Sequence, residues 1–212
     1  MMLSRPTALL FDFDGTLIDS ARSVLAGLGH ALKNAGIAPK LPLNASIIGP
    51  PLKQTLARLA GTDEPVLIDA MSAAFREHYD LEGYRDTDVY PGVPELLSGL
   101  HDAAIPLYIV TNKRIAPTRL ILDHLGWLDW FTGVYALDAL EPPAAHKPAL
   151  VAHVLTKHAL AQQSTWMVGD SSEDRRSAEL NGLRFFAANW GYGSAGDGLD
   201  KPLALLERAG LA

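Results

Sequence analysis

Short apolar runs alternate with longer segments of helical period over much of the chain. Between the runs, apolar residues recur three and four positions apart, as at Leu96, Leu97 and Leu100, which predicts helices. Strands in alternation with helices favour a parallel sheet covered on both faces. We therefore expect an α/β fold with a Rossmann-like, doubly wound parallel sheet. Five runs have the composition of buried strands: Ala8 to Phe11, Ile105 to Val110, Val134 to Leu137, Thr165 to Val168 and Leu183 to Ala188.

Residues 18–85 break this alternation, because they carry helical stripes without a strand. One stripe begins at Ala21 and is closed by Gly36, and a second is closed by Gly61. A third runs from Val66 to Phe75. We expect an inserted all-helical cap domain at 18–85 and an α/β catalytic core made of 1–17 and 86–212. Both connections of the insert lie beside the end of the first strand, so we expect the cap to open and close over a site there.

Composition narrows the classes of protein. The 212 residues are 48% hydrophobic and 20% charged, which is ordinary for a folded globule. A net charge of −6 without a long Lys/Arg cluster disfavours a nucleic-acid partner. The absence of Cys excludes a disulfide framework and a Cys-based zinc site, and it suits a reducing cytoplasm. No apolar run approaches the ~20 residues needed to span a bilayer, so we expect a soluble cytoplasmic protein without a membrane partner.

Two acidic residues, Asp12 and Asp14, follow the first apolar run and precede a glycine turn at Gly15. Residues two apart in an extended segment point to the same face, so their carboxylates can share one ligand. An unpaired buried charge costs several kcal/mol, so a segment built this way needs a cation or a reaction. A divalent metal is the obvious candidate.

Other strand ends carry polar residues as well, and ligands of open α/β sheets bind beyond these ends. Thr111-Asn112 follows the second run, and Asp170 to Asp174 follows the fourth. Lys147-Pro148 lies between them, at the mouth of an expected helix. We expect all of these groups to converge on the edge that carries the first two acids. The lysine, the hydroxyl, the amide and turn N–H groups together supply what a dianionic phosphate needs.

This set of strand-end residues suits phosphoryl transfer better than other reactions. Carboxylates alone repel a phosphate, but Mg²⁺ held by Asp12, a main-chain oxygen near Asp14, and Asp170 removes the repulsion. Asp12 is then free to attack phosphorus through its other oxygen and form an aspartyl-phosphate. Asp14 would protonate the leaving oxygen and later take a proton from the hydrolytic water.

Four segments in order resemble the motifs of the haloacid dehalogenase superfamily of phosphohydrolases: Asp12-x-Asp14-Gly15-Thr16, Thr111, Lys147 and Gly169-Asp170-x-x-x-Asp174. The match spans nearly the whole chain, with one departure, Leu150 in place of the second proline of the lysine motif. The resemblance implies a small helical cap and Mg²⁺ as cofactor. It implies catalytic roles for Asp12, Asp14, Thr111 and Lys147, metal ligation by Asp12, Asp14, Asp170 and Asp174, and substrate binding by Gly15, Thr16, Thr111, Asn112 and Lys147.

Some of these residues have more than one interpretation. Asp174 either reaches the metal, directly or through water, or orients Lys147. Asn112 either contacts substrate or forms a turn, and Thr111 could simply cap a helix. In the insert, Lys53 and Arg58 are candidates for binding a carboxylate or second phosphate of the substrate, although exposed helix charges are the ordinary interpretation.

Three further segments look like the phosphoglycolate phosphatase branch and its relatives that act on nucleotides or pyrophosphate. We expect a phosphatase for a small, phosphoglycolate-like monoester, acting as a monomer or homodimer on a phosphorylated metabolite. A 5'-nucleotidase or pyrophosphatase is the alternative. A haloacid dehalogenase is less favoured because Asp14 would have no task, and a non-catalytic phosphate-binding protein because the nucleophile, acid and lysine are intact. The segments are Ile48 to Leu52, Val89 to Leu97 and Trp190 to Gly193.

Two other patterns do not predict a functional site. Gly191 to Gly196 matches the dinucleotide-binding fingerprint literally, but the chain ends before the required acid. His146, His153 and His158 are seven and five residues apart, which does not put all three on one helical face for a metal.

Overall fold

The computed structural model describes residues 5–193 and 196–211, and the chain divides into two compact units. One unit contains Met1–Ile18 and Val89–Ala212, and the other contains Asp19–Asp88. The strands β2 (Ile18–Asp19) and β3 (Asp88–Val89) pair where the chain passes between the units. Neither strand was expected, because two residues are too few to stand out as an apolar run. The assignment of the units as catalytic core and cap stays a prediction.

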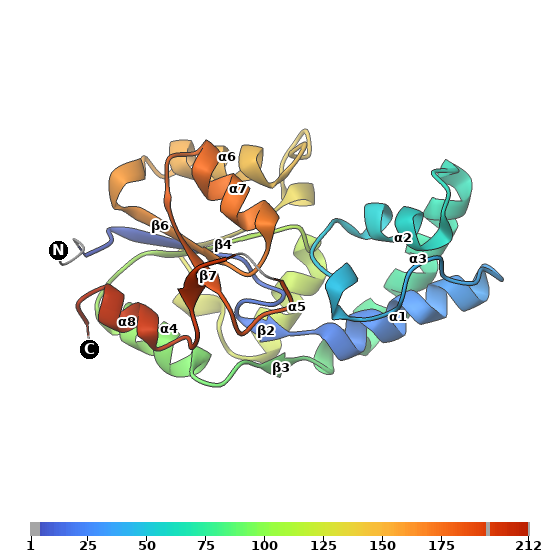
Figure 1. Ribbon diagram of the computed structural model, residues 1–212, viewed down its shortest axis with the longest axis horizontal. Coiled ribbons are helices and arrows are strands. Elements are labelled where there is room, and N and C mark those ends of the chain that lie inside the picture. The colour runs from blue at the N-terminus through green and yellow to red at the C-terminus, as the bar shows by residue number, and fades with distance from the viewer. Residues whose placement is uncertain (1–4, 194–195, 212) are drawn as a thin grey trace. The chain divides into compact units, whose positions relative to one another are not determined.

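The α/β unit is built on a six-stranded sheet with the order β5-β4-β1-β6-β7-β8 (Figure 1). All of its neighbouring strands run parallel, and β1 lies between β4 and β6, with Leu10 paired to Tyr108 on one side and Met167 on the other. The predicted α/β fold with a parallel sheet is confirmed. The strands are β1 (Ala8–Phe11), β4 (Leu107–Thr111), β5 (Gly133–Ala136), β6 (Thr165–Gly169), β7 (Arg184–Ala188) and β8 (Gly198–Leu199).

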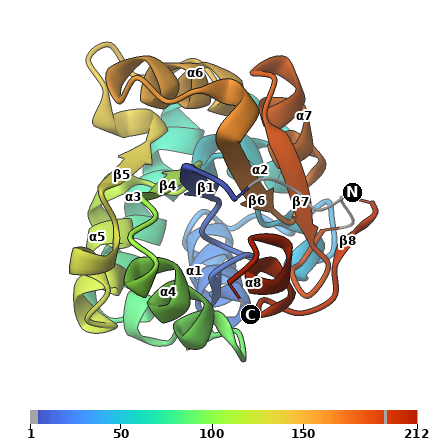
Figure 2. The same ribbon diagram turned by 90° about the vertical axis from the view of Figure 1, so that its left-hand side faces the viewer.

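Helices cover both faces of this sheet because its central strands are apolar on both sides (Figure 2). All four residues of β1 are fully buried. On one face, α6 (Lys147–Lys157) and α7 (Ser172–Leu180) pack Leu150, Val154 and Ala178 into a cluster with Leu10 and Met167. The opposite face carries α4 (Val93–Asp102) and α8 (Ala204–Arg208). The helix α5 (Ile115–His124) follows β4.

The helical unit consists of α1 (Ala21–Asn34), α2 (Leu52–Ala60) and α3 (Pro65–Leu81), with short 3₁₀ turns at Ala45–Ile47 and Gly83–Arg85. The helices α1 and α3 pack closely, and a Cβ added at Gly27 would lie 2.8 Å from the Phe75 ring. Arg22 at the start of α1 forms an ion pair with Asp86 at the end of the unit. Leu28, Leu56 and Phe75 of these three helices are buried, so the unit has its own apolar core.

Strand ends differ by a few residues from the sequence prediction. β4 begins at Leu107 because Pro106 lacks the N–H of a strand residue, and β5 ends at Ala136 because a 3₁₀ turn begins at Leu137. The two-residue strand β8 adds a sixth member that has no apolar run of its own. None of the helices in the described ranges is long and apolar enough to cross a membrane.

Candidate functional site

The turn after β1 places Asp12 at the carboxyl edge of the sheet. Its backbone N–H donates to the carbonyl of Val168 in β6 at 2.9 Å, so the residue stays next to the end of that strand. The chain then leaves the extended conformation, because the Phe13 carbonyl accepts the N–H of Leu17 at 3.0 Å. Gly15 has φ 84°, and a Cβ there would lie 2.4 Å from Asp170 Oδ2. Glycine thus lets the first acidic turn approach the second.

Three buried carboxylates, from Asp12, Asp170 and Asp174, form the centre of the site. One oxygen of each lies within 4.8 Å of the others, and the residues are 7%, 4% and 0% exposed. We call these three residues the acidic triad. Oxygen atoms at this spacing are the ligands that hard divalent cations prefer. The acidic triad therefore fits a metal ion.

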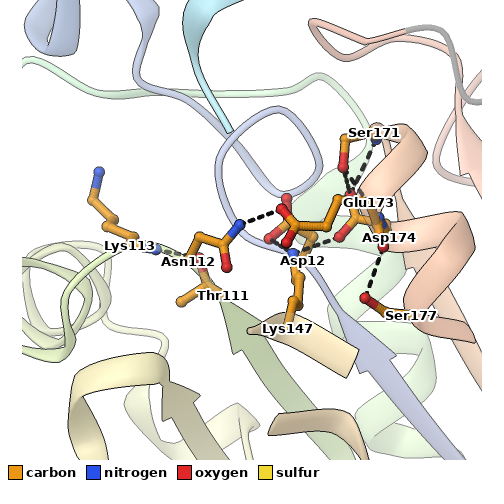
Figure 3. Close-up of polar contacts among 9 residues, drawn as sticks. All are labelled: Asp12, Thr111, Asn112, Lys113, Lys147, Ser171, Glu173, Asp174 and Ser177. Carbon is orange, nitrogen blue, oxygen red and sulfur yellow. Dashed lines mark hydrogen bonds and ion pairs between the residues drawn. The ribbon is translucent and has the colours of Figure 1, made fainter. Parts of the chain in front are cut away.

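Lys147, the first residue of α6, supplies a cation to the acidic triad. Its Nζ lies 2.5 Å from Asp12 Oδ1 and 2.5 Å from Asp174 Oδ1, and its side chain is only 3% exposed (Figure 3). The helix start is fixed by His146, whose Nδ1 accepts the N–H of Ala149 at 3.2 Å, and by Pro148 in the first turn. The residues that fix the start of α6 therefore also fix the position of Lys147 at the site.

Burial and mutual repulsion dominate the electrostatics of this centre. Burial, and then the charge of Asp174, raise the pKa of Asp12 well above its usual range, although Lys147 opposes this. Burial and the charge of Asp174 also raise the pKa of Asp170 to about 6. Burial works against the charge on Lys147, but Asp12 and Asp174 outweigh it and raise the pKa of the lysine. One lysine does not balance three carboxylates, so a further cation is favoured here.

Asp174 has both carboxylate oxygens engaged by protein groups. Oδ2 accepts the N–H and the hydroxyl of Ser171 at 3.0 and 2.5 Å, and the Ser171 hydroxyl accepts the Asp174 N–H at 3.2 Å. This reciprocal capping box fixes the start of α7. Oδ1 meets Lys147 as an ion pair without the alignment of a hydrogen bond. Of the two interpretations of Asp174, its contacts favour the one in which it orients the lysine.

The end of β4 brings three consecutive side chains to the site edge. The Thr111 hydroxyl oxygen accepts the backbone N–H of Lys113 at 3.1 Å, which leaves its O–H available to a ligand. Asn112 Nδ2 donates to Glu173 Oε2 at 2.6 Å (Figure 3). Lys113 Nζ donates to Asp14 Oδ1 at 3.0 Å. Asp14 therefore has a lysine partner and lies outside the acidic triad. That Asp12 and Asp14 share one ligand stays a prediction.

Residues 9–188 match the family model described as haloacid dehalogenase-like hydrolase. The chain belongs to this family. The expected resemblance is confirmed, and the Asp12, Thr111, Lys147 and Asp170 positions of its motifs meet at one sheet edge.

Relatives of this haloacid dehalogenase-like chain are named for different activities. It is 34% identical to the tyrosine-protein kinase PtkA of Mycobacterium tuberculosis strain H37Rv over 92% of this chain, but it spans only 66% of that protein. It is 33% identical to a 5'-nucleotidase of Pseudomonas aeruginosa, covering 88% and 84% of the two chains. A phosphoglycolate phosphatase of Cereibacter sphaeroides is 34% identical, with 87% and 85% covered. The structure of a predicted phosphatase from Clostridium acetobutylicum superposes with TM-score 0.80 at 26% identity, covering 98% and 92%.

Sequence reasoning missed how the Trp190 to Gly193 loop holds this haloacid dehalogenase-like site. The backbone N–H groups of Tyr192 and Gly193 donate to Asp170 Oδ2 at 2.8 and 2.9 Å, and Trp190 Nε1 donates to the Thr16 carbonyl at 2.9 Å. A Cβ at Gly191 would lie 2.1 Å from the Gly15 carbonyl oxygen. The glycines of this loop allow close packing onto the acidic turns, which is the signal in the sequence that could have identified it.

Lys113 and Glu173 were also missed, because their partners lie 99 and 61 residues away. The two candidates in the helical unit are placed in α2. Lys53 forms an ion pair with Asp69 at 2.5 Å, with both side chains more than half exposed, and Arg58 is exposed. Substrate binding by Lys53 and Arg58 stays a prediction.

Proposed function

We propose that this protein is a Mg²⁺-dependent phosphatase that hydrolyses a small phosphate monoester through a phosphorylated Asp12. The observation that carries the proposal is the buried Asp12 carboxylate, held 2.5 Å from Lys147 within the acidic triad. A carboxylate that lies beside a fixed lysine, among oxygen atoms placed to bind a metal, is suited to attack on phosphorus. A purely structural role would not need this arrangement.

In the first step, an oxygen of Asp12 forms a bond to phosphorus while the bond from phosphorus to the ester oxygen breaks. The departing oxygen keeps the electron pair and takes a proton from the Asp14 carboxyl group. Lys147 and the Thr111 hydroxyl offset charge on the phosphoryl oxygens, and Asn112 is a further candidate donor. The products are an alcohol and the aspartyl-phosphate.

In the second step, water attacks phosphorus and gives a proton to the Asp14 carboxylate. The bond between phosphorus and the Asp12 oxygen breaks, which restores the Asp12 carboxylate and releases inorganic phosphate. The sum is one ester and one water converted to one alcohol and one phosphate, with no oxidant or reductant needed.

Asp12, Asp170 and a main-chain oxygen near Asp14 would hold Mg²⁺, and Asp174 would act mainly on Lys147. The bound ion supplies positive charge that allows a phosphate dianion to enter a carboxylate-rich site. The Trp190 to Gly193 loop donates two backbone N–H groups to Asp170 Oδ2 and would hold this carboxylate in place for the ion.

Phosphoglycolate-like esters are the proposed substrates, supported by the similarity to phosphoglycolate phosphatases. A nucleoside monophosphate is the second candidate, favoured by the similarity to a 5'-nucleotidase over most of both chains. We propose that residues 18–85 act as a cap that selects among such substrates through Lys53 and Arg58. We further propose that the protein works in the cytoplasm, as a monomer or homodimer.

Turnover of p-nitrophenyl phosphate with Mg²⁺ and with EDTA tests the reaction. We expect Mg²⁺-dependent release that Asp12→Asn abolishes and that Asp123→Asn, an exposed acid in α5, leaves unchanged. Quenching with hydroxylamine should convert the acyl phosphate to a hydroxamate that peptide mass mapping locates at Asp12. Metal-independent release, or full activity of Asp12→Asn, contradicts the proposal.

A panel of phosphoglycolate, AMP, pyrophosphate, and ATP with a tyrosine-containing peptide separates the substrate classes. We expect the highest kcat/KM for phosphoglycolate. A higher value for AMP or pyrophosphate selects the alternative, and phosphate transfer from ATP to the peptide would place this chain functionally with PtkA.

A further inference from the structure

Lys113 and Asp14 form an ion pair that the site motifs do not account for. Lys113 Nζ lies 3.0 Å from Asp14 Oδ1, and the side chains are 8% and 13% exposed. Removing one partner of a largely buried pair leaves the other charge poorly compensated, so each side chain is held in place by the other. An ordinary surface lysine, screened by water, would not restrict its partner in this way.

The backbone around Lys113 is fixed to the same edge of the sheet. Its N–H donates to the Thr111 hydroxyl oxygen at 3.1 Å, directly after β4. The ladder that pairs Phe11 with Ile109 places the ends of β1 and β4 side by side. The lysine therefore reaches Asp14 from a neighbouring strand end rather than from a loose loop.

Two lysines thus serve two different carboxylate groups. Lys147 contacts Asp12 and Asp174 of the acidic triad, whereas the Lys113 side chain is directed away from Asp12 and Lys147 (Figure 3). Asp14 does not belong to the acidic triad. The lysine that contacts Asp14 is therefore a different residue from the lysine that contacts the nucleophile Asp12.

We propose that Lys113 is a positioning residue, which acts through Asp14 by holding its carboxylate in the place from which it exchanges protons with the leaving group and with water. Lys113 does not contact the phosphoryl group. This inference rests on the proposed phosphatase function, because it assigns Lys113 to the proton-transfer partner of that reaction.

Leaving-group dependence distinguishes this role from a structural one. The value of kcat/KM covers the steps up to phosphorylation of Asp12, in which the departing oxygen needs a proton only when it is strongly basic. Loss of Lys113 should therefore harm esters of poor leaving groups most. A general loss of packing or of phosphate binding would lower kcat/KM equally for all esters.

The experiment measures kcat/KM for a series of substituted phenyl phosphates with the intact protein and Mg²⁺. For Lys113→Met we expect a loss of roughly 10- to 100-fold on phenyl phosphate and under about 5-fold on p-nitrophenyl phosphate, because misplacing a general acid removes part of its usual rate contribution. The KM for p-nitrophenyl phosphate should stay nearly constant. Lys113→Arg should recover part of the loss, and Lys157→Met, an exposed lysine of α6, should behave as wild type.

The Asp14→Asn background tests whether Lys113 acts through Asp14. Adding Lys113→Met to Asp14→Asn should cost no further activity, because the two residues form one unit. An additive loss, or equal losses for all leaving groups, overturns the proposal. A KM increase confined to substrates with a carboxylate also overturns it, since Lys113 would then bind substrate.

If Lys113→Met does not fold, Lys113→Gln and Lys113→Arg give the same comparison. Failure of the phosphatase function itself would appear in the wild-type protein, whereas failure of this inference appears only among the variants.

Discussion

Lys147 in the α/β unit and Lys53 in the helical unit lie equally close to a carboxylate, at 2.5 Å, but in opposite surroundings. The Lys147 side chain is 3% exposed and Asp12 is 10% exposed, whereas Lys53 and Asp69 are 58% and 61% exposed. Water and salt screen the exposed pair, while the buried pair is largely removed from water. Burial, and not distance, therefore distinguishes the pair to which we assign the chemistry.

Replacing Lys147 should produce the largest effect. Lys147→Met leaves Asp12 and Asp174 buried without their cation, so we expect a loss of about 3 to 5 kcal/mol in the free energy of unfolding of the metal-free protein. Turnover should fall to background. Urea unfolding with EDTA measures the first quantity, and p-nitrophenyl phosphate assays with Mg²⁺ measure the second. Lys157→Met is the control, and a stability equal to wild type would show that the buried pair has no special weight.

The acidic triad should also make the metal-free protein less stable as the pH rises. Burial and Asp174 raise the pKa of Asp170 to about 6 in the folded state, against about 3.9 in an unfolded chain. The native state then binds this proton more tightly, so its contribution is full below about pH 4 and is lost as the pH rises through about 6. The change is at most about 2 to 3 kcal/mol.

Urea unfolding of wild type and Asp170→Asn in EDTA between pH 4.5 and 7.5 isolates this contribution from other carboxylates. The difference between the two proteins should favour Asp170→Asn increasingly towards pH 7.5, and Mg²⁺ should reverse it. Parallel pH profiles would mean that the Asp170 carboxyl group is not destabilised by burial.

The loop that packs on Asp170 offers a smaller perturbation of the same region. In Gly191→Ala the new Cβ would meet the Gly15 carbonyl oxygen at 2.1 Å, so the two turns must move apart. We expect a stability loss of about 1 to 3 kcal/mol, typical of overpacking. Mg²⁺ affinity, measured by titration calorimetry, should fall roughly 10- to 100-fold because the support of a ligand is displaced.

Gly29→Ala is the matched control, since a Cβ there meets nothing closer than 4.0 Å. It lies inside α1 and should stabilise the protein by about 0.5 to 1 kcal/mol. Unchanged Mg²⁺ affinity in Gly191→Ala would mean that the loop does not support Asp170.

How much of the fold could be predicted from the sequence depends on whether an element has its own apolar pattern. The five main strands are visible because buried parallel strands need continuous apolar runs, and the acids and lysine are visible because they follow such runs or open a helix. β8 was not predicted, because its two residues are defined by pairing with β7 and not by their own pattern. Short strands of this kind depend on tertiary contacts.

Within the site, residue identities were easier to predict than their partners. Asp12, Asp170 and Lys147 come together as expected because the strand order brings their elements to one edge. The contacts of Asp14 with Lys113 and of Asn112 with Glu173 depend on side-chain directions across different strand ends. No local period encodes those directions, so the sequence alone could not assign them.

Lys53→Ala should produce the smallest effect. It tests the exposed member of the comparison, the ion pair of Lys53 with Asp69. Because both partners are more than half exposed, we expect a stability change of only about 0.2 to 1 kcal/mol. If Lys53 serves substrate selection as proposed, its loss should raise the KM for phosphoglycolate while leaving that for p-nitrophenyl phosphate unchanged. Asp69→Ala, which breaks the same ion pair but keeps the lysine, should give the same stability change without the KM effect. Equal KM values in all three proteins would leave Lys53 as an ordinary surface charge and assign selection to other residues of the helical unit.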